Sequence, residues 1–232
     1  MRILALDTAT EACSVTLLDD ERRISRYEEP GRGHAERILP MIDAVLGEAK
    51  RELADLDAIA VGRGPGAFTG VRIAISVAQG LAFGAHKRVV PVSDLAALAQ
   101  RVADERNAFT VLACIDARMG ELYWGCYERD PRGLVTLIGE ERVSKAADVR
   151  LPPGADWYGA GSGWNVATLS HRVRSMDDVS SRLLPRLFPR AEEIARLAAP
   201  EIAAGRTVAP EEALPVYLRD HVAVPMSQKT RT

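Results

Sequence analysis

The chain has 232 residues, of which 47% are hydrophobic, so it can bury the core of one large domain or of two lobes. Its 30 basic and 32 acidic side chains give a net charge of −2. Proteins that bind nucleic acid by themselves usually have a basic surface for phosphate contacts, so this charge does not favour that function. No apolar run is long enough to cross a membrane and no signal sequence is evident, so we expect a cytoplasmic protein without membrane contact.

In the first half, hydrophobic patterning predicts five strands and three helices. The strands lie at 2–6, 13–18, 22–27, 58–61 and 88–92, and the helices at 34–50, 71–83 and 94–104. Pro40 falls inside the first helix and predicts a kink or a later start there. Ser93 stands directly before the third helix, where it suits the N-cap position.

A glycine-rich stretch between strand 58–61 and helix 71–83 is the most unusual local feature of the first half. It carries four glycines, Gly62, Gly64, Gly66 and Gly70. A glycine loop that opens a helix can cradle an anion, because backbone N–H groups and the helix dipole point at it. The loop lacks the lysine of a P-loop, so a tight strand-to-helix turn is an equally good reading at this point.

In the second half, the pattern predicts four strands and two helices. The strands lie at 110–116, 121–129, 134–138 and 156–158, and the helices at 144–150 and 191–204. Residues 172–181 are polar and show no clear hydrophobic periodicity, which suggests a loop that leaves the main fold. Three single cysteines, Cys13, Cys114 and Cys126, stand in apolar segments and are expected to be buried reduced thiols.

The two halves resemble each other in the order of their elements. Asp7 ends the first strand of one half, and Asp116 ends that of the other. A GxGxG triplet follows a strand in both, at 62–66 and at 159–163. The alternative is a chance match of two glycine loops, but the shared order favours an α/β fold of two duplicated βββαβα lobes. We expect lobes at 1–105 and 106–224, with the last helix able to pack back on the first, and a flexible tail at 225–232.

Four segments carry a resemblance to a known family: 1–14 (MRILALDTATEACS), 62–72 (GRGPGAFTGVR), 116–123 (DARMGELY) and 215–220 (PVYLRD). They resemble the TsaB (YeaZ) family, in the TsaD-related branch of the actin/hexokinase/Hsp70-like ATPase superfamily. The resemblance implies a non-catalytic subunit that supports TsaD in transferring threonylcarbamoyl from its adenylate to the tRNA adenosine beside the anticodon. It also implies work with the ATPase TsaE, a homodimer through the helical face used for TsaD, and tRNA contact mainly through TsaD.

The residues themselves bear on the non-catalytic expectation. TsaD-like proteins carry an HxxxH metal pair, and matching the local pattern places its positions on Asp94 and Leu98. Two residues four apart share a helix face, but a carboxylate and an alkyl group cannot hold a catalytic metal. No histidine is otherwise spaced for a metal, so we expect no metal, no cofactor and no catalytic residue.

Weak nucleotide binding is a remaining possibility for the cleft between the lobes. The candidate residues are Asp7, Thr8, Thr10, Gly64, Gly66 and Asp116, although the usual lysine is absent. Arg63 could reach an anion or be solvated, and Arg118 with Glu121 suggests an ion pair that shapes the second lobe. A nucleotide-dependent small-molecule kinase or acyltransferase is the main alternative function, and a metalloprotease is a third.

Helix 71–83 is apolar nearly all round, which indicates burial on more than one side. We expect helices 34–50 and 71–83 to pack against the same helix pair of TsaD or of a second copy of this chain. The alternative is that helix 71–83 is buried wholly within its own lobe. The expected interface residues are Met41, Val45, Arg72, Ile75, Ser76, Gln79 and Phe83. Charged substitutions at Val45 and Gln79 are predicted to abolish the complex and to leave the monomer folded.

Overall fold

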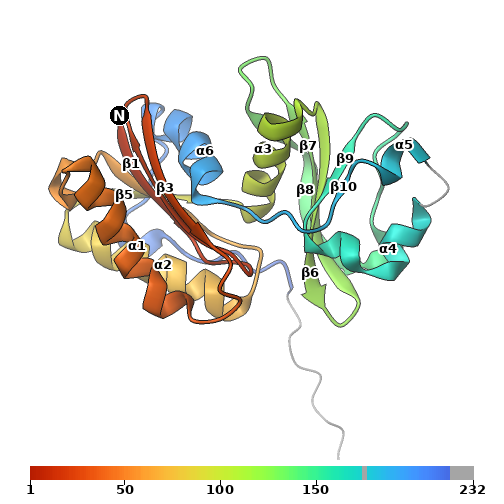
Figure 1. The fold of residues 1–232 in the computed structure, drawn as a ribbon, viewed down its shortest axis with the longest axis horizontal. Helices are drawn as coiled ribbons and strands as arrows, with labels where there is room; N and C mark the ends of the chain where they lie inside the picture. The colour runs from red at the N-terminus through yellow and green to blue at the C-terminus, as the bar shows by residue number, and fades with distance from the viewer. Residues whose placement is uncertain (174–176, 220–232) are drawn as a thin grey trace, which may run out of the picture.

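The computed structural model describes residues 1–173 and 177–219. Two five-stranded mixed sheets stand side by side, and helices fill the space between them and cover their outer faces (Figure 1). This arrangement confirms the predicted α/β class with two lobes. In the described residues, no helix is long and apolar enough to cross a membrane. The predicted tail at 225–232 lies outside these residues.

The first sheet contains β1 to β5 in the order β3-β2-β1-β4-β5. Its strands are β1 (Arg2–Asp7), β2 (Cys13–Asp19), β3 (Arg22–Glu28), β4 (Ala58–Gly62) and β5 (Arg88–Val92). Central β1 pairs antiparallel with β2 and parallel with β4. Because β1 and β4 are covered on both faces, both are nearly continuous apolar runs, whereas edge strand β3 is largely exposed and polar.

The second sheet repeats this plan with the order β10-β9-β6-β7-β8. Its strands are β6 (Thr110–Arg118), β7 (Glu121–Arg129), β8 (Val135–Lys145), β9 (Tyr158–Ala160) and β10 (Leu183–Leu184). Here too, the first strand pairs antiparallel with the second and parallel with the fourth. The predicted duplication is therefore present in strand order as well as in strand direction.

Six helices and four short 3-10 turns connect the strands in the described part of the chain. The helices are α1 (His34–Ala49), α2 (Phe68–Gly84), α3 (Asp94–Arg106), α4 (Ala167–Arg172), α5 (Asp177–Ser180) and α6 (Ala191–Ala203). The 3-10 turns are η1 (Leu53–Asp55), η2 (Ala146–Asp148), η3 (Ser162–Asn165) and η4 (Pro210–Glu212). Helices α1 and α2 cover the outer face of the first sheet, whereas α3 and α6 lie between the two sheets (Figure 1).

The two inner helices each pack on a sheet from the other half of the chain. Helix α6 places Ile194 and Ala198 in one apolar cluster with Ile3 of β1. Helix α3 contributes Leu95 and Leu98 to a cluster with the strands of the second sheet. Each helix therefore joins the two halves by burial of apolar area.

The largest differences from the predicted elements lie in the second half. Strand β8 pairs with β7 as far as Lys145, so the expected helix at 144–150 is only the turn η2. The polar stretch 172–181 includes the end of α4 and the short helix α5. Helix α1 begins at His34, so Pro40 does not delay its start. The N-cap prediction is confirmed, because Ser93 Oγ accepts the Ala96 N–H at 3.2 Å.

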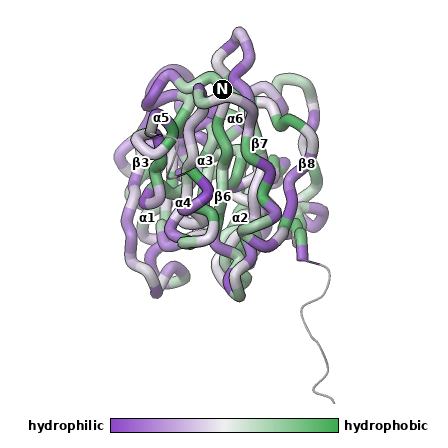
Figure 2. The backbone as a smooth tube through the Cα atoms, turned by 90° about the vertical axis from the view of Figure 1, so that its right-hand side faces the viewer, coloured by the Kyte–Doolittle hydropathy of each residue, from purple (hydrophilic) through white to green (hydrophobic). Residues whose placement is uncertain are grey.

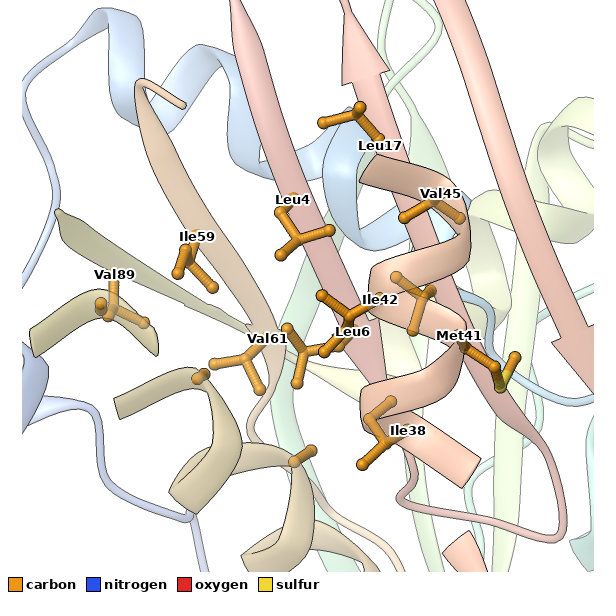
Figure 3. Packing of buried hydrophobic residues seen from close by; sticks show 14 of the residues in the cluster. Leu4, Leu6, Leu17, Ile38, Met41, Ile42, Val45, Ile59, Val61 and Val89 are labelled. Carbon is orange, nitrogen blue, oxygen red and sulfur yellow. The ribbon is translucent and has the colours of Figure 1, made fainter. Parts of the chain in front are cut away.

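The core of the first lobe lies between its sheet and α1 with α2. Helix α1 turns Ile38, Met41, Ile42 and Val45 towards strand residues such as Leu17 (Figure 3). Figure 2 shows hydrophobic residues along the inner strands and hydrophilic residues in many connecting loops. Two of the three cysteines, Cys13 and Cys114, are fully buried as predicted, and Cys126 is partly buried.

Candidate functional site

A cleft of about 910 Å³ opens between the two lobes. The turn after β1, the loop before α1 and the first turn of α2 form its wall on the first lobe. The end of β6 forms its wall on the second lobe. Of the predicted nucleotide-binding residues, Thr8, Thr10, Gly66 and Asp116 line this cleft. Its size is in the range of small-molecule sites.

The glycine loop that leads to α2 presses against its own chain. A Cβ at Gly66 would lie 2.3 Å from the Ala9 carbonyl oxygen, and a Cβ at Gly70 would lie 2.1 Å from that of Thr8. Real Cβ atoms do not approach an oxygen that closely. Only glycine at these two positions therefore allows the turn after β1 to pack against the start of α2. This close packing explains the glycines without an anion and favours the tight-turn reading.

Asp7 does not face the cleft. Its carboxyl group is fully buried beside that of Asp94, also fully buried, at the first turn of α3. Asp7 Oδ1 accepts the Ala9 N–H at 2.8 Å, and Asp94 Oδ2 accepts the Gly64 N–H at 2.5 Å. The expectation that Asp7 flanks the cleft opposite Asp116 is therefore wrong. The reason is a long-range contact, since the partner carboxyl stands 87 residues later in the chain, at 94 against 7.

Burial raises the pKa of both carboxyls, and the pKa of Asp94 rises well above its usual range because Asp7 adds a like charge. Among the described residues, Asp7 Oδ2 and Asp94 Oδ1 are buried with no hydrogen-bond donor. A single proton held between the two carboxyls would satisfy both oxygens. The folded chain therefore keeps a proton on this pair up to a higher pH than the unfolded chain does.

Replacing Asp94 by asparagine is expected to remove this pH dependence and to stabilise the chain at high pH, because the Asn amide N–H donates a hydrogen bond to Asp7 without uptake of a proton from solvent. A raised pKa in the folded state stabilises below the unfolded pKa, and this stability is lost as pH rises towards the folded value. Each pH unit in that window costs the wild type about 1.4 kcal/mol. Urea unfolding from pH 5 to 9 measures the slope.

Asp116→Asn is the matched control for this prediction, because Asp116 lies near the end of the equivalent strand β6 but is partly exposed and pairs with Arg118 at 3.3 Å. Its pH slope should equal that of the wild type. An Asp94→Asn variant with the wild-type slope would contradict the shared proton.

The remaining predicted polar residues have partners other than those expected. Gly64, with φ +93°, lies under the Val216 carbonyl and outside the cleft, so its place in the nucleotide-binding set is corrected. Arg63 points towards Glu141 of the second lobe, with its Nη2 4.0 Å from Glu141 Oε2. Arg118 and Glu121 do not pair with each other, since Glu121 Oε2 accepts Arg219 Nη2 at 2.5 Å.

The position of the metal pair expected from TsaD-like proteins does not fit a metal. Leu98 is fully buried in the apolar cluster around α3, and the carboxyl of Asp94 is buried against that of Asp7. Across residues 1–173 and 177–219, no three His, Cys, Asp or Glu side chains gather as metal ligands.

The outer surface of α1 and α2 differs from the predicted interface. Met41, Val45 and Ile75 are at most 5% exposed and belong to the core of their own lobe, so their assignment to a partner surface is wrong. The reason is that α1 and α2 turn these residues towards the sheet. Arg72 and Gln79 are half-buried, and Gln79 Nε2 donates to the Ala213 carbonyl at 3.2 Å.

What α1 and α2 do expose is an apolar and small-residue stripe. Ser76, Gly80 and Phe83 follow one another at helical spacing on α2, and Phe83 is 75% exposed. Leu39 of α1 is 49% exposed. A Cβ at Gly80 would meet nothing within 4 Å. Gly80 and Leu39 are absent from the predicted set, although the spacing of Ser76, Gly80 and Phe83 is visible in the sequence.

Two residues near the end of the described chain also line the cleft, namely Tyr217 and Arg219. They stand in the segment 215–220, which the sequence marks only by its family resemblance. No periodicity or charge pattern predicts their position, because they reach the cleft through contacts with both lobes.

Comparison with known proteins gives consistent matches. Residues 27–222 match the family model described as TsaD, tRNA N6-adenosine threonylcarbamoyltransferase. The chain is 44% identical to the tRNA threonylcarbamoyladenosine biosynthesis protein TsaB of Escherichia coli K12, over 96% of each chain. The protein of the same name from Haemophilus influenzae is 36% identical, with 96% of this chain and 95% of that one covered. YeaZ from Pseudomonas aeruginosa superposes with a TM-score of 0.84 at 50% identity, over 94% of this chain and 99% of that one.

Proposed function

The chain belongs to the TsaB (YeaZ) family of tRNA threonylcarbamoyladenosine biosynthesis proteins, and we propose that it is a cytoplasmic, non-catalytic subunit of the threonylcarbamoyl transferase complex. In this proposal it binds TsaD and supports transfer of threonylcarbamoyl from its adenylate to the adenosine beside the anticodon. TsaE is the further partner, and tRNA is contacted mainly through TsaD, which agrees with the net charge of −2.

The observation that carries the partner assignment is the exposed stripe on α2. Ser76 and Gly80 allow another helix to approach closely, and Phe83 offers a large apolar side chain at one end. Leu39 of the neighbouring helix α1 is also exposed. The described part of the chain leaves this stripe without a covering element, so an apolar partner surface from TsaD, or from a second copy of this chain, fits it.

The proposal gives no catalytic step to the cleft. Its candidate carboxylate Asp7 is buried against Asp94, and the Thr8 hydroxyl donates to the Gly70 carbonyl at 2.7 Å. Of the two carboxylates predicted for nucleotide binding, only Asp116 lines the cleft, and it pairs there with Arg118. The cleft is also lined by Glu11 and by four arginines, of which Arg72 lies over the Phe68 ring and Arg219 binds Glu121; the other two are Arg32 and Arg118.

Peptidase chemistry through a cysteine has little support as well. Burial raises the pKa of Cys13 to about 12, and burial also raises the pKa of Cys114. Thiols with raised pKa values carry little thiolate at neutral pH, so they are weak nucleophiles.

The test is reconstitution of tRNA modification with purified TsaD, TsaE and threonylcarbamoyl-adenylate, with and without this chain. We expect modified adenosine only when the chain is present, and a complex with TsaD on gel filtration. Asp116→Asn should retain full support. Equal modification without the chain, or ATP turnover by the chain alone that is lost in Asp116→Asn, would replace this proposal with an enzymatic one.

A further inference from the structure

The last described segment, residues 213–219, crosses from the first lobe to the second along the rim of the cleft, and is here called the C-terminal strap. In Figure 1 it runs from α2 towards the lower end of β6. Ala213 is fully buried in the core of the first lobe, and its carbonyl accepts Gln79 Nε2. The Val216 N–H donates to the Arg63 carbonyl at 2.9 Å. These contacts fix one end of the strap to the first lobe.

An aromatic and cationic stack holds the middle of the strap at the start of α2. The Arg72 guanidinium carbon lies 3.3 Å from the centre of the Phe68 ring and 5.1 Å from that of Tyr217. The two rings are 6.1 Å apart. Both rings are partly exposed, and cation–π contacts at exposed sites each stabilise by roughly 0.5–1 kcal/mol, so the stack adds to the Val216 hydrogen bond in placing Tyr217 over the first turn of α2.

The far end of the strap is fixed to the second lobe. Arg219 Nη2 donates to Glu121 Oε2 at 2.5 Å and to the Ala117 carbonyl at 3.0 Å. The side chain of Arg219 is only 20% exposed. Since Ala117 and Glu121 flank the β6–β7 turn, this end of the strap holds the second lobe at the cleft rim. The pair is partly buried, so it is screened less by salt than a fully exposed surface pair.

We propose that the C-terminal strap is a clasp that sets the separation of the two lobes at the mouth of the cleft. Within the described residues, the chain otherwise passes between the lobes from α3 to β6 and from β10 to α6, and the packing of α3 and α6 joins the lobes away from the cleft rim. Tyr217 and Arg219 line the cleft from the rim, so release of the strap widens the cleft and uncovers the start of α2. The clasp acts within the chain and does not depend on binding to TsaD.

Spin-label distances across the cleft test the clasp. One label at Glu11→Cys sits on the cleft wall of the first lobe, and the other at Met119→Cys sits on the exposed β6–β7 turn of the second lobe. Cys126→Ser removes the accessible native thiol, since Cys13 and Cys114 are buried. Arg219→Ala should lengthen and broaden the distance distribution. Arg206→Ala is the matched control, because it removes an arginine–glutamate pair, to Glu201, that does not join the lobes. Its distribution should equal that of the parent.

Two further measurements keep the test decisive. Glu121→Gln removes the charge of the Arg219 partner with little change in shape, and should lengthen the distance in the same direction. Chymotrypsin cleavage after Tyr217 should become about tenfold faster in Arg219→Ala, because the freed strap enters a protease more often. Unchanged distances in folded Arg219→Ala and Glu121→Gln, or an unchanged cleavage rate, would overturn the clasp. Loss of TsaD binding without these changes would concern the partner surface instead.

Discussion

Replacing Gly80 by arginine is expected to reduce binding of the chain to TsaD by roughly 100-fold and to leave the fold intact. The Cβ position at Gly80 meets nothing within 4 Å, so the new side chain points into free space on the exposed side of α2. Inside a helix, arginine is favoured over glycine by up to about 1 kcal/mol, so the isolated chain should be slightly more stable. A helix that packs closely over Gly80 has no room for the guanidinium.

Titration of TsaD with each variant, alongside thermal unfolding, measures both effects. Ala203→Arg is the matched control, since Ala203 is exposed on α6, a helix on the other side of the first sheet. Gly80→Ala tests size without charge and should weaken binding less. Wild-type affinity in a folded Gly80→Arg variant would place the TsaD surface elsewhere. If the chain forms homodimers through the same stripe, the variant should also run as a monomer.

The sequence predicts α2 well in kind but not in orientation. Its apolar residues spread around the helix, so periodicity indicates burial on several sides and cannot say which side stays open. The structure resolves this, because Ile75 faces the core, while Ser76, Gly80 and Phe83 face outwards. The side facing the sheet is decided by where the glycine loop starts the helix, namely at Phe68 and not at Val71.

The strand order of both lobes follows from the repeat, whereas the site depends on contacts between distant segments. Asp7 carries the signal of a cleft carboxylate, namely its place at the end of β1, and only the position of Asp94 in space reveals that the two are paired. Glu121 likewise has a nearby cation in Arg118, yet its partner is Arg219, 98 residues further on. Neither pairing follows from a regular spacing of residues, so neither can be found in a single sequence.

The prediction of a helix at 144–150 is wrong for a different reason. Residues 139–145 are mostly polar and carry no strict alternation, so their pattern ends the predicted strand at Ile138. Pairing with β7 continues β8 to Lys145 nevertheless, because Trp124 and Tyr123 of β7 offer a ladder beside it. Tertiary pairing thus decides the state of a segment whose own preference is weak.

Val45→Glu is expected to unfold the chain, which reverses the prediction made from the sequence. Val45 has no exposed surface and packs in the cluster that holds Leu4 and Leu17 (Figure 3). A carboxylate placed there loses its water and gains no partner, so the free energy of unfolding should fall by more than about 4 kcal/mol. Circular dichroism and urea titration of the purified variant measure the loss.

Leu39→Glu is the control that separates the fold from the partner surface. Leu39 lies on the same helix but is 49% exposed, so the free energy of unfolding should change by only about 0.5 kcal/mol. If the open side of α1 and α2 receives TsaD, this variant should lose binding while it stays folded. A stable Val45→Glu variant would mean that α1 can turn its inner face outwards. A folded Leu39→Glu variant with full affinity would confine the TsaD contact to α2, where Gly80→Arg tests it alone.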